Sequence, residues 1–201
     1  MKTLFLLFLL STVTINAIAQ EQIEPPAVSA PGEADASISK GNWLVGANIA
    51  STGYNFSNDT YNLFINPKAG YFIGENIAVG SEVVLGLEAF DGGTNFRYGI
   101  TPFLRYYFTQ GGGPSGRIFQ EALVGIAGSS LEDNEEDEPV SFIIGIRFGY
   151  AHFIARNIAI EPILGYTYTK ADLGSSSSGG GGLALALGFQ IYLPGRGAGG
   201  E

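Results

Sequence analysis

Residues 77–89, with the sequence IAVGSEVVLGLEA, divide into two sets by a two-residue alternation. One set is apolar and holds Ile77, Val79, Val83, Leu85 and Leu87. The other set joins two carboxylates to small residues: Glu82 and Glu88 with Ala78, Gly80 and Gly86. Side chains of a strand point alternately to its two faces. This stretch therefore predicts a strand with one apolar face and one face of charged and small residues.

The same pattern occurs in eight segments of the chain. They cover approximately residues 42–50, 61–72, 77–89, 96–108, 117–128, 140–153, 158–169 and 183–193. Each is long enough to cross a tilted bilayer, which takes about 9–11 residues. An apolar outside and a polar inside are typical of barrels in lipid. We therefore expect an all-β protein, an eight-stranded antiparallel up-and-down transmembrane β-barrel over residues 41–193.

The N-terminus has the layout of a secretory signal peptide. Lys2 gives a positive start, residues 4–10 form a short apolar core, and Ala17-Ile18-Ala19 is a small-residue cleavage site. The apolar run is too short for a membrane anchor. We predict a signal peptide over residues 1–19, and therefore export.

Composition limits the remaining possibilities. The 201-residue chain has no cysteine, 30 glycines and a net charge of −9. The cysteine count excludes disulfides and thiolate metal sites, and the acidic balance argues against nucleic-acid binding. Residues 20–40 are rich in Pro, Ala, Ser and acids, so we expect a disordered periplasmic linker. Residues 194–201 are expected to form a flexible tail.

The connections between the predicted strands fall into two sets. FIGENIAV at residues 72–79 recurs as FIARNIAI at residues 153–160, which predicts two copies of one tight hairpin. Polar connections lie at residues 51–60, 90–95, 129–139 and 170–182. Outer-membrane barrels have short periplasmic turns and longer extracellular loops. We expect the acidic and Ser/Gly-rich loops to face outside.

The acidic loop at residues 131–139 carries six carboxylates. A run of like charge is usually a solvated loop, and the spacing of an EF-hand is absent. We therefore expect no metal and no cofactor here, with Ca²⁺ or Mg²⁺ binding as the alternative.

Aromatic residues gather near the ends of the predicted strands, where amphipathic rings favour the membrane interface. One set would mark the periplasmic boundary and the other the outer one: Trp43, Tyr71, Tyr106, Phe108, Tyr150 and Tyr192, and then Tyr61, Phe96, Tyr98, Phe142, Tyr166 and Tyr168.

Three motifs resemble the small outer-membrane β-barrel family of OmpX/OmpA-like eight-stranded proteins: PKAGYF at residues 67–72, NIAV at 76–79 and GFQIYL at 188–193. The resemblance implies a monomer in the outer membrane, surrounded by outer-membrane lipid and lipopolysaccharide. It also implies that the barrel-assembly machinery reads a C-terminal signal made of Gly188, Phe189, Ile191, Tyr192 and Leu193.

The charged residues on the polar parity are the candidate functional site. Five are cations and four are carboxylates: Lys68, Arg97, Arg105, Arg117 and Arg147, with Glu82, Glu88, Glu121 and Glu161. Side chains just fill an eight-stranded barrel, and buried charges persist only when they are paired. We expect a salt-bridged plug that fills the lumen, with a narrow ion path as the alternative.

A catalytic role would need a nucleophile, a base and an orienting carboxylate within hydrogen-bond reach. The only histidine, His152, falls on the apolar parity with no carboxylate near it on that face. We therefore expect no enzyme activity. Pro67, Pro102 and Pro162 lie inside predicted strands, so each predicts a bulge or a local break.

Three functions are compatible with these patterns. The first is an outer-membrane barrel with a structural or surface-interaction role, and the second is a small ion-conducting porin. The third is a secreted soluble β-barrel that binds an apolar ligand, with Leu183, Leu185 and Leu187 inside.

Overall fold

The computed structural model describes residues 33–55, 60–90, 93–113, 115–131, 140–170 and 179–195. The predicted signal peptide, most of the acidic loop and most of the C-terminal tail lie outside these residues.

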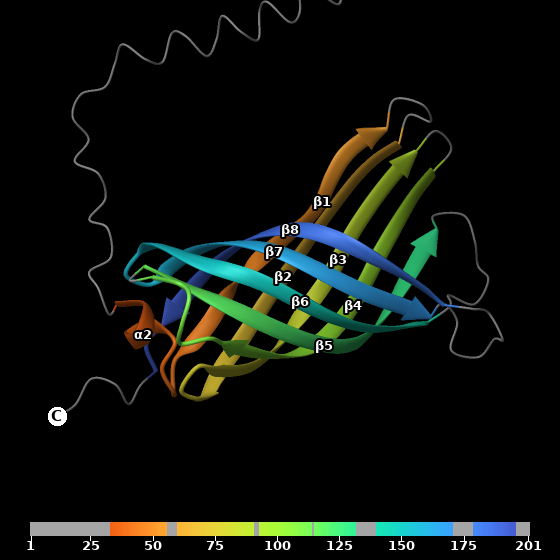
Figure 1. Cartoon of the computed structure of the whole chain (residues 1–201). Helices are drawn as coiled ribbons and strands as arrows, with labels where there is room; N and C mark the ends of the chain where they lie inside the picture. Colours follow the sequence, from red (N-terminus) through yellow and green to blue (C-terminus); the bar gives the residue numbers. More distant parts are fainter. Residues whose placement is uncertain are drawn as a thin grey trace, which may run out of the picture.

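Eight strands form one closed barrel in which each strand is antiparallel to its neighbours and the order follows the sequence (Figure 1). The strands are β1 (Trp43–Asn55), β2 (Thr60–Gly74), β3 (Ile77–Phe90), β4 (Gly93–Tyr107), β5 (Gly116–Leu131), β6 (Ser141–Ala155), β7 (Ile158–Lys170) and β8 (Gly180–Leu193). The predicted fold class is therefore confirmed. No helix in the described part of the chain is long and apolar enough to span a membrane.

The alternation of side chains follows the predicted parity. In β3, Val83 and Leu85 lie on the outside, whereas Glu82, which precedes Val83, is only 1% exposed. In β8, Leu183, Leu185 and Leu187 also lie on the outside. The soluble-barrel alternative, which needed these leucines inside, is therefore wrong.

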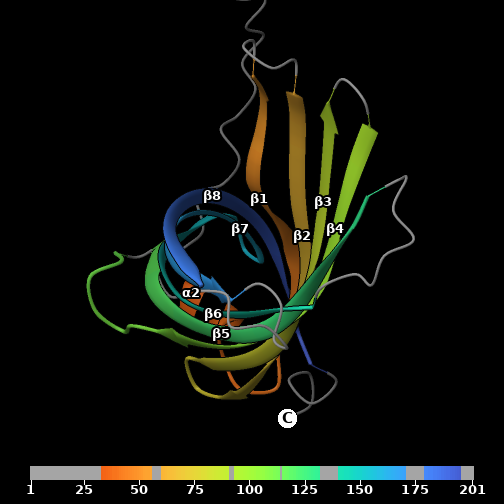
Figure 2. The ribbon, with the colours of Figure 1, turned by 90° about the vertical axis from the view of Figure 1, so that its right-hand side faces the viewer.

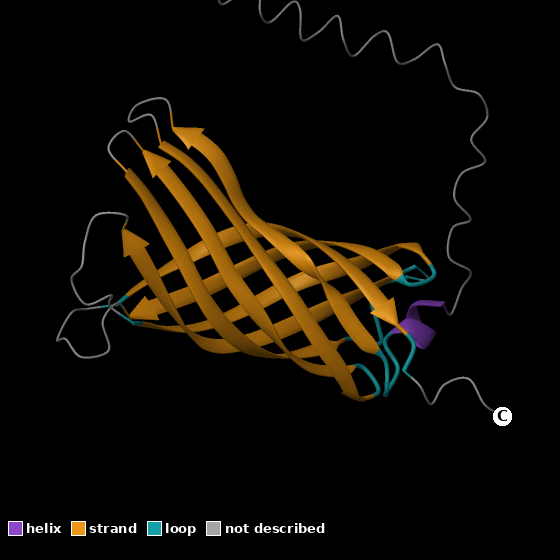
Figure 3. Ribbon diagram, turned by 180° about the vertical axis from the view of Figure 1, so that it is seen from behind, coloured by secondary structure: helices purple, strands orange, loops and turns teal. Residues whose placement is uncertain are grey.

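The repeated motif forms two equivalent hairpins. Each has a two-residue turn, and each carries a register shift at the same place, between Phe72 and Gly74 in one and between Phe153 and Ala155 in the other. Asn76 takes a left-handed conformation in the first turn, with φ of 64°. These hairpins and the third short connection, between β4 and β5, lie at one end of the barrel with the described chain ends (Figure 3). We call this the turn end and the opposite one the loop end.

The three strand prolines mark local breaks in the hydrogen-bond ladders. The β4–β5 ladder omits the pairs of Thr101 and Pro102 and resumes in the same register. The β2–β3 ladder does the same at Pro67, and the β6–β7 ladder at Pro162. A proline has no N–H to donate. One of the two ladders of its strand therefore lacks the pairs at that position. Of the two expected outcomes, break and bulge, the described ladders show the break at all three positions.

Glycines on the inner face let aromatic rings lie flat against the wall. A Cβ on Gly149 would come within 2.3 Å of the Phe119 ring, and a Cβ on Gly80 within 2.6 Å of the Phe103 ring. Both rings are buried in the lumen. Part of the high glycine content is therefore a packing requirement.

A short helix, α2 (Glu33–Ser37), covers the turn end of the barrel (Figure 1). Ala34 and Ile38 are fully buried among the aromatic side chains there. The carbonyl of Ile38 accepts a hydrogen bond from the amide of Asn76 at 3.2 Å, which ties the segment to the first hairpin turn. Residues 33–40, which the sequence analysis placed in a disordered linker, are therefore ordered.

The barrel closes along only part of β1 and β8. Their ladder runs from the Trp43–Leu193 pair to the Ile49–Leu187 pair, and no further pair joins them in the described residues. Beyond it, β1 pairs with β2 alone and β8 with β7 alone. A register shift after Ile49 bends β1 at this point. Towards the loop end, β1–β4 run away from β7 and β8 (Figure 2).

Candidate functional site

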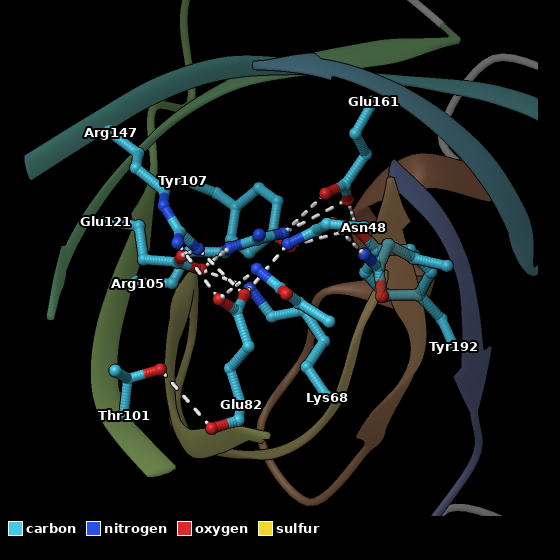
Figure 4. A network of polar contacts seen from close by, with 12 residues as sticks. Asn48, Lys68, Glu82, Thr101, Arg105, Tyr107, Glu121, Arg147, Glu161 and Tyr192 are labelled. Carbon is cyan, nitrogen blue, oxygen red and sulfur yellow. Dashed lines mark hydrogen bonds and ion pairs between the residues drawn. The ribbon is translucent and has the colours of Figure 1, made fainter. Parts of the chain in front are cut away.

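The centre of the lumen holds a network of six charged side chains, one from each of six successive strands (Figure 4). They are Lys68 in β2, Glu82 in β3, Arg105 in β4, Glu121 in β5, Arg147 in β6 and Glu161 in β7. Uncharged side chains complete it: Asn48 in β1, Asn66 in β2, Tyr107 in β4, and Gln190 and Tyr192 in β8. We call this set the lumen network, and all eight strands contribute to it.

Glu121 accepts from all three cations of the network. Its Oε2 lies 2.7 Å from Lys68 Nζ and 2.8 Å from Arg105 Nε, and its Oε1 lies 3.1 Å from Arg147 Nη1. The Glu121 side chain is completely buried, as are those of Lys68 and Arg105. These short contacts replace the water that the carboxylate would otherwise need.

Glu82 is the second centre. Arg147 donates to both of its oxygens, at 2.7 and 2.9 Å. The side-chain amides of Asn48 and Asn66 add bonds of 2.9 and 3.1 Å. Lys68 Nζ lies 3.7 Å from Oε2 and so links Glu82 to Glu121. The two carboxylates are held together by shared cations.

Within the network, a closed ring of hydrogen bonds includes two tyrosines nearer the turn end. Arg105 Nη1 donates to Tyr107 Oη at 2.9 Å and to Glu161 at 2.9–3.0 Å. Tyr192 Oη donates to Glu161 Oε1 at 2.8 Å. The Tyr192 hydroxyl proton is thereby used, so Tyr107 donates in the 2.8 Å bond between the two hydroxyls. Each of the four side chains fixes the next.

The lumen network carries three positive and three negative charges, so its formal charges cancel. Aromatic faces cover two of the cations: Lys68 Nζ lies 4.2 Å from the Phe103 ring and Arg105 Cζ lies 3.8 Å from the Phe119 ring. Such contacts suit cations that have lost their water. Each charged side chain of the network therefore has a partner of opposite charge.

Three of the nine residues predicted for the network lie elsewhere. Arg97 and Glu88 form a separate pair with 3.9 Å between Nη2 and Oε2, and the Arg97 side chain is 51% exposed. Arg117 forms an ion pair with Asp35 of α2, with 3.1 Å between Nε and Oδ1. The alternation of side chains identified which residues face inward, but it could not predict how far along the barrel axis each of them lies.

The sequence analysis also missed uncharged members of the network. They are Asn48, Asn66, Tyr107, Gln190 and Tyr192. All lie on the inner parity of their strands, so the same alternation would have found them. Tyr192 had been placed in the periplasmic aromatic girdle and is instead only 2% exposed, in the lumen. Its parity partner in β8, Gln190, is completely buried beside it.

Two other features were considered as sites: His152 for catalysis and the acidic loop for metal binding. His152 lies on the exposed outer face and stacks on Tyr150 with 6.1 Å between ring centroids. No group of three or more His, Cys, Asp or Glu able to hold a metal occurs among the described residues. Residues 132–139 of the acidic loop lie outside them, so its alternative of cation binding stays open.

Comparison with solved structures supports the same fold. Neisserial surface protein A is 14% identical with a TM-score of 0.56, covering 76% of this chain and 97% of that chain. The N-terminal β-barrel domain of Pseudomonas aeruginosa OprF is 14% identical with a TM-score of 0.48, covering 77% and 98%. The outer membrane enzyme PagL is 19% identical with a TM-score of 0.41, covering 74% and 98%. No protein-family model matches the sequence, and no curated protein does.

The similarity to Neisserial surface protein A supports the fold, and at 14% identity it establishes no activity. The chain has the architecture of small eight-stranded outer-membrane barrels.

Proposed function

We propose that this protein is an integral outer-membrane β-barrel with a structural or surface-interaction role and a lumen closed by its charge network. The apolar outer face supports membrane placement, because large apolar side chains are exposed on all eight strands. An exposed apolar surface of that extent needs lipid around it. The export signal and the C-terminal assembly signal, read by the barrel-assembly machinery, belong to the same proposal.

The main support for the closed lumen is the burial of oppositely charged side chains that six strands contribute. Arg105 is completely buried and bonded to both Glu121 and Glu161, which are completely buried as well. An ion that entered would have to separate these pairs, and breaking a buried pair costs about 3–5 kcal/mol. The burial of these charges supports the closed lumen over the small-porin alternative, which needs a water-filled path at this level.

Conductance across a planar bilayer tests this proposal. We expect the refolded wild-type barrel to give no steady current steps. Arg105→Ala removes a network cation, whereas Arg97→Ala removes the exposed cation of the separate pair. A wild-type current that Arg105→Ala alters and Arg97→Ala leaves unchanged would establish the porin and refute the closed lumen.

The proposal includes the absence of catalysis and of a resident cofactor. It also assigns the contacts with outside partners to the polar loops at residues 51–60, 129–139 and 170–182. A monomer surrounded by outer-membrane lipid and lipopolysaccharide is the proposed state.

A further inference from the structure

The lumen contains a cavity between the lumen network and the loop end. Its volume is about 360 Å³, which is within the range of small-molecule sites. Its walls are mainly apolar and include Phe64, Leu123, Ile143 and Ile163. Its polar lining includes Asn66 and Arg147, which are also members of the network.

The lining of this cavity includes a polar side chain with an unused hydrogen-bond acceptor. Asn66 is 7% exposed, and its Nδ2 is fixed by donation to Glu82 Oε1 at 3.1 Å. Its Oδ1 is buried and has no hydrogen-bond partner in the described structure. Most buried polar atoms have a partner, so an unpaired acceptor in the lining of a cavity indicates a site for a donor.

The charges around the cavity limit the kind of molecule that can supply this hydrogen-bond donor. Three cations and three carboxylates cancel in the network below the cavity. The lining itself holds two cations, Arg147 and Arg97, and each already has a carboxylate partner, Glu82 at 2.7 Å and Glu88 at 3.9 Å respectively. A charged head group would lose its water and gain no opposite charge in excess. An uncharged hydroxyl or amide head on an apolar chain matches both the polar lining and the apolar walls.

The cavity also reaches the unpaired edge of β8. Ala184 and Ala186 line it, and both lie beyond Leu187, where the β1–β8 ladder stops. Leu183 and Leu185 on the outer side of this edge are 75% and 73% exposed, against 37% for Leu85 in the fully paired β3. Leu185 pairs with Leu164, whose side chain belongs to the apolar outer face. The unpaired edge therefore lies at the level of the apolar outer face.

We propose that the outer part of the lumen binds an uncharged single-chain amphiphile, such as a fatty alcohol, that exchanges with the bilayer along the unpaired edge of β8. In the proposed function the network closes the axial path below the cavity, so the unpaired edge gives an apolar chain a route that avoids the buried charges. The lateral route depends on the proposed placement in a membrane.

Photolabelling tests this inference. The full-length barrel is placed in phospholipid nanodiscs with a medium-chain fatty alcohol that carries a diazirine, and labelled residues are mapped by mass spectrometry. We expect label on inward-facing Leu123 and Ile143 as well as on outward-facing Val124. Label confined to outward-facing residues would overturn the site.

Two adjacent substitutions in β8 test the route. Ala184→Trp fills the cavity at the open edge, whereas Leu185→Trp points to the outside. We expect Ala184→Trp to lower the inner label about tenfold, which corresponds to about 1.4 kcal/mol, and Leu185→Trp to leave it unchanged. Inner label that Ala184→Trp does not lower would overturn the route.

Folding of each variant is checked by a heat-dependent shift in gel mobility. If Ala184→Trp fails it, Thr167→Trp in the cavity wall and Tyr168→Trp on the outer face form the replacement pair. A conducting barrel that still labels inside would refute the closed lumen alone. A silent barrel that labels only outside would refute the amphiphile site alone.

Discussion

The hydroxyls of Tyr107 and Tyr192 lie 2.8 Å apart, although the residues are separated by 85 positions in the chain. Their backbone amides are held in matching ways. Tyr107 N donates to Asn76 O at 2.8 Å and Tyr192 N to Asn157 O at 2.7 Å, so each tyrosine is anchored to one copy of the repeated hairpin. The sequence repeat thus places two equivalent side chains at the same level of the lumen.

The tyrosine pair predicts a measurable coupling. Tyr192→Phe leaves the Tyr107 hydroxyl without its acceptor, and an unsatisfied buried group costs about 1–3 kcal/mol. We expect each single Phe variant to lower the free energy of unfolding in micelles, and the double variant to cost less than the sum by at least about 0.5 kcal/mol. Tyr106→Phe on the outer face is the control. Strictly additive effects would contradict the hydrogen-bonded ring.

Glu82 and Glu88 lie on the same face of β3, but only Glu82 belongs to the lumen network. Substitutions at these two carboxylates therefore distinguish the stability that the network contributes from that of a charge outside it. Glu82→Gln breaks the buried contacts with Arg147, so we expect a loss of about 3–5 kcal/mol in urea unfolding. Glu88→Gln affects only the more exposed pair with Arg97, and a loss of at most about 1 kcal/mol is expected. Equal losses would mean that the network does not stabilise the barrel.

The alternation of side chains was enough to predict the strand number, the closed antiparallel order and the inner face. It was not enough to predict which inner residues meet. Arg97 and Arg105 have the same parity in β4, yet only Arg105 joins the network, because contact depends on strand stagger around the barrel. Asp35 was missed as the partner of Arg117 because its segment has the composition of a linker.

Close packing of aromatic rings on the inner wall gives a third prediction. Gly149→Ala places a Cβ against the Phe119 ring, and overpacking costs about 1–3 kcal/mol. The same change in a Phe119→Leu background is expected to cost less. Gly180→Ala meets no atom within 4 Å and is the control. A Gly149→Ala variant as stable as Gly180→Ala would contradict the packing.

Cysteine labelling tests the proposed orientation, because the chain contains no native cysteine. Ser177→Cys lies in the Ser/Gly-rich loop, and Ser39→Cys lies after α2 at the turn end. A maleimide that cannot cross membranes should label Ser177→Cys on intact cells and Ser39→Cys only after lysis. The reverse labelling pattern would show that the barrel has the opposite orientation in the membrane.

The most direct test of a closed barrel in the outer membrane is the gel mobility of that membrane fraction in SDS, unboiled against boiled. A closed barrel resists SDS until heated, so we predict a faster band in the unboiled sample and a slower one after boiling. A band that does not shift, with the protein recovered from the soluble fraction in plain buffer, would contradict the membrane barrel.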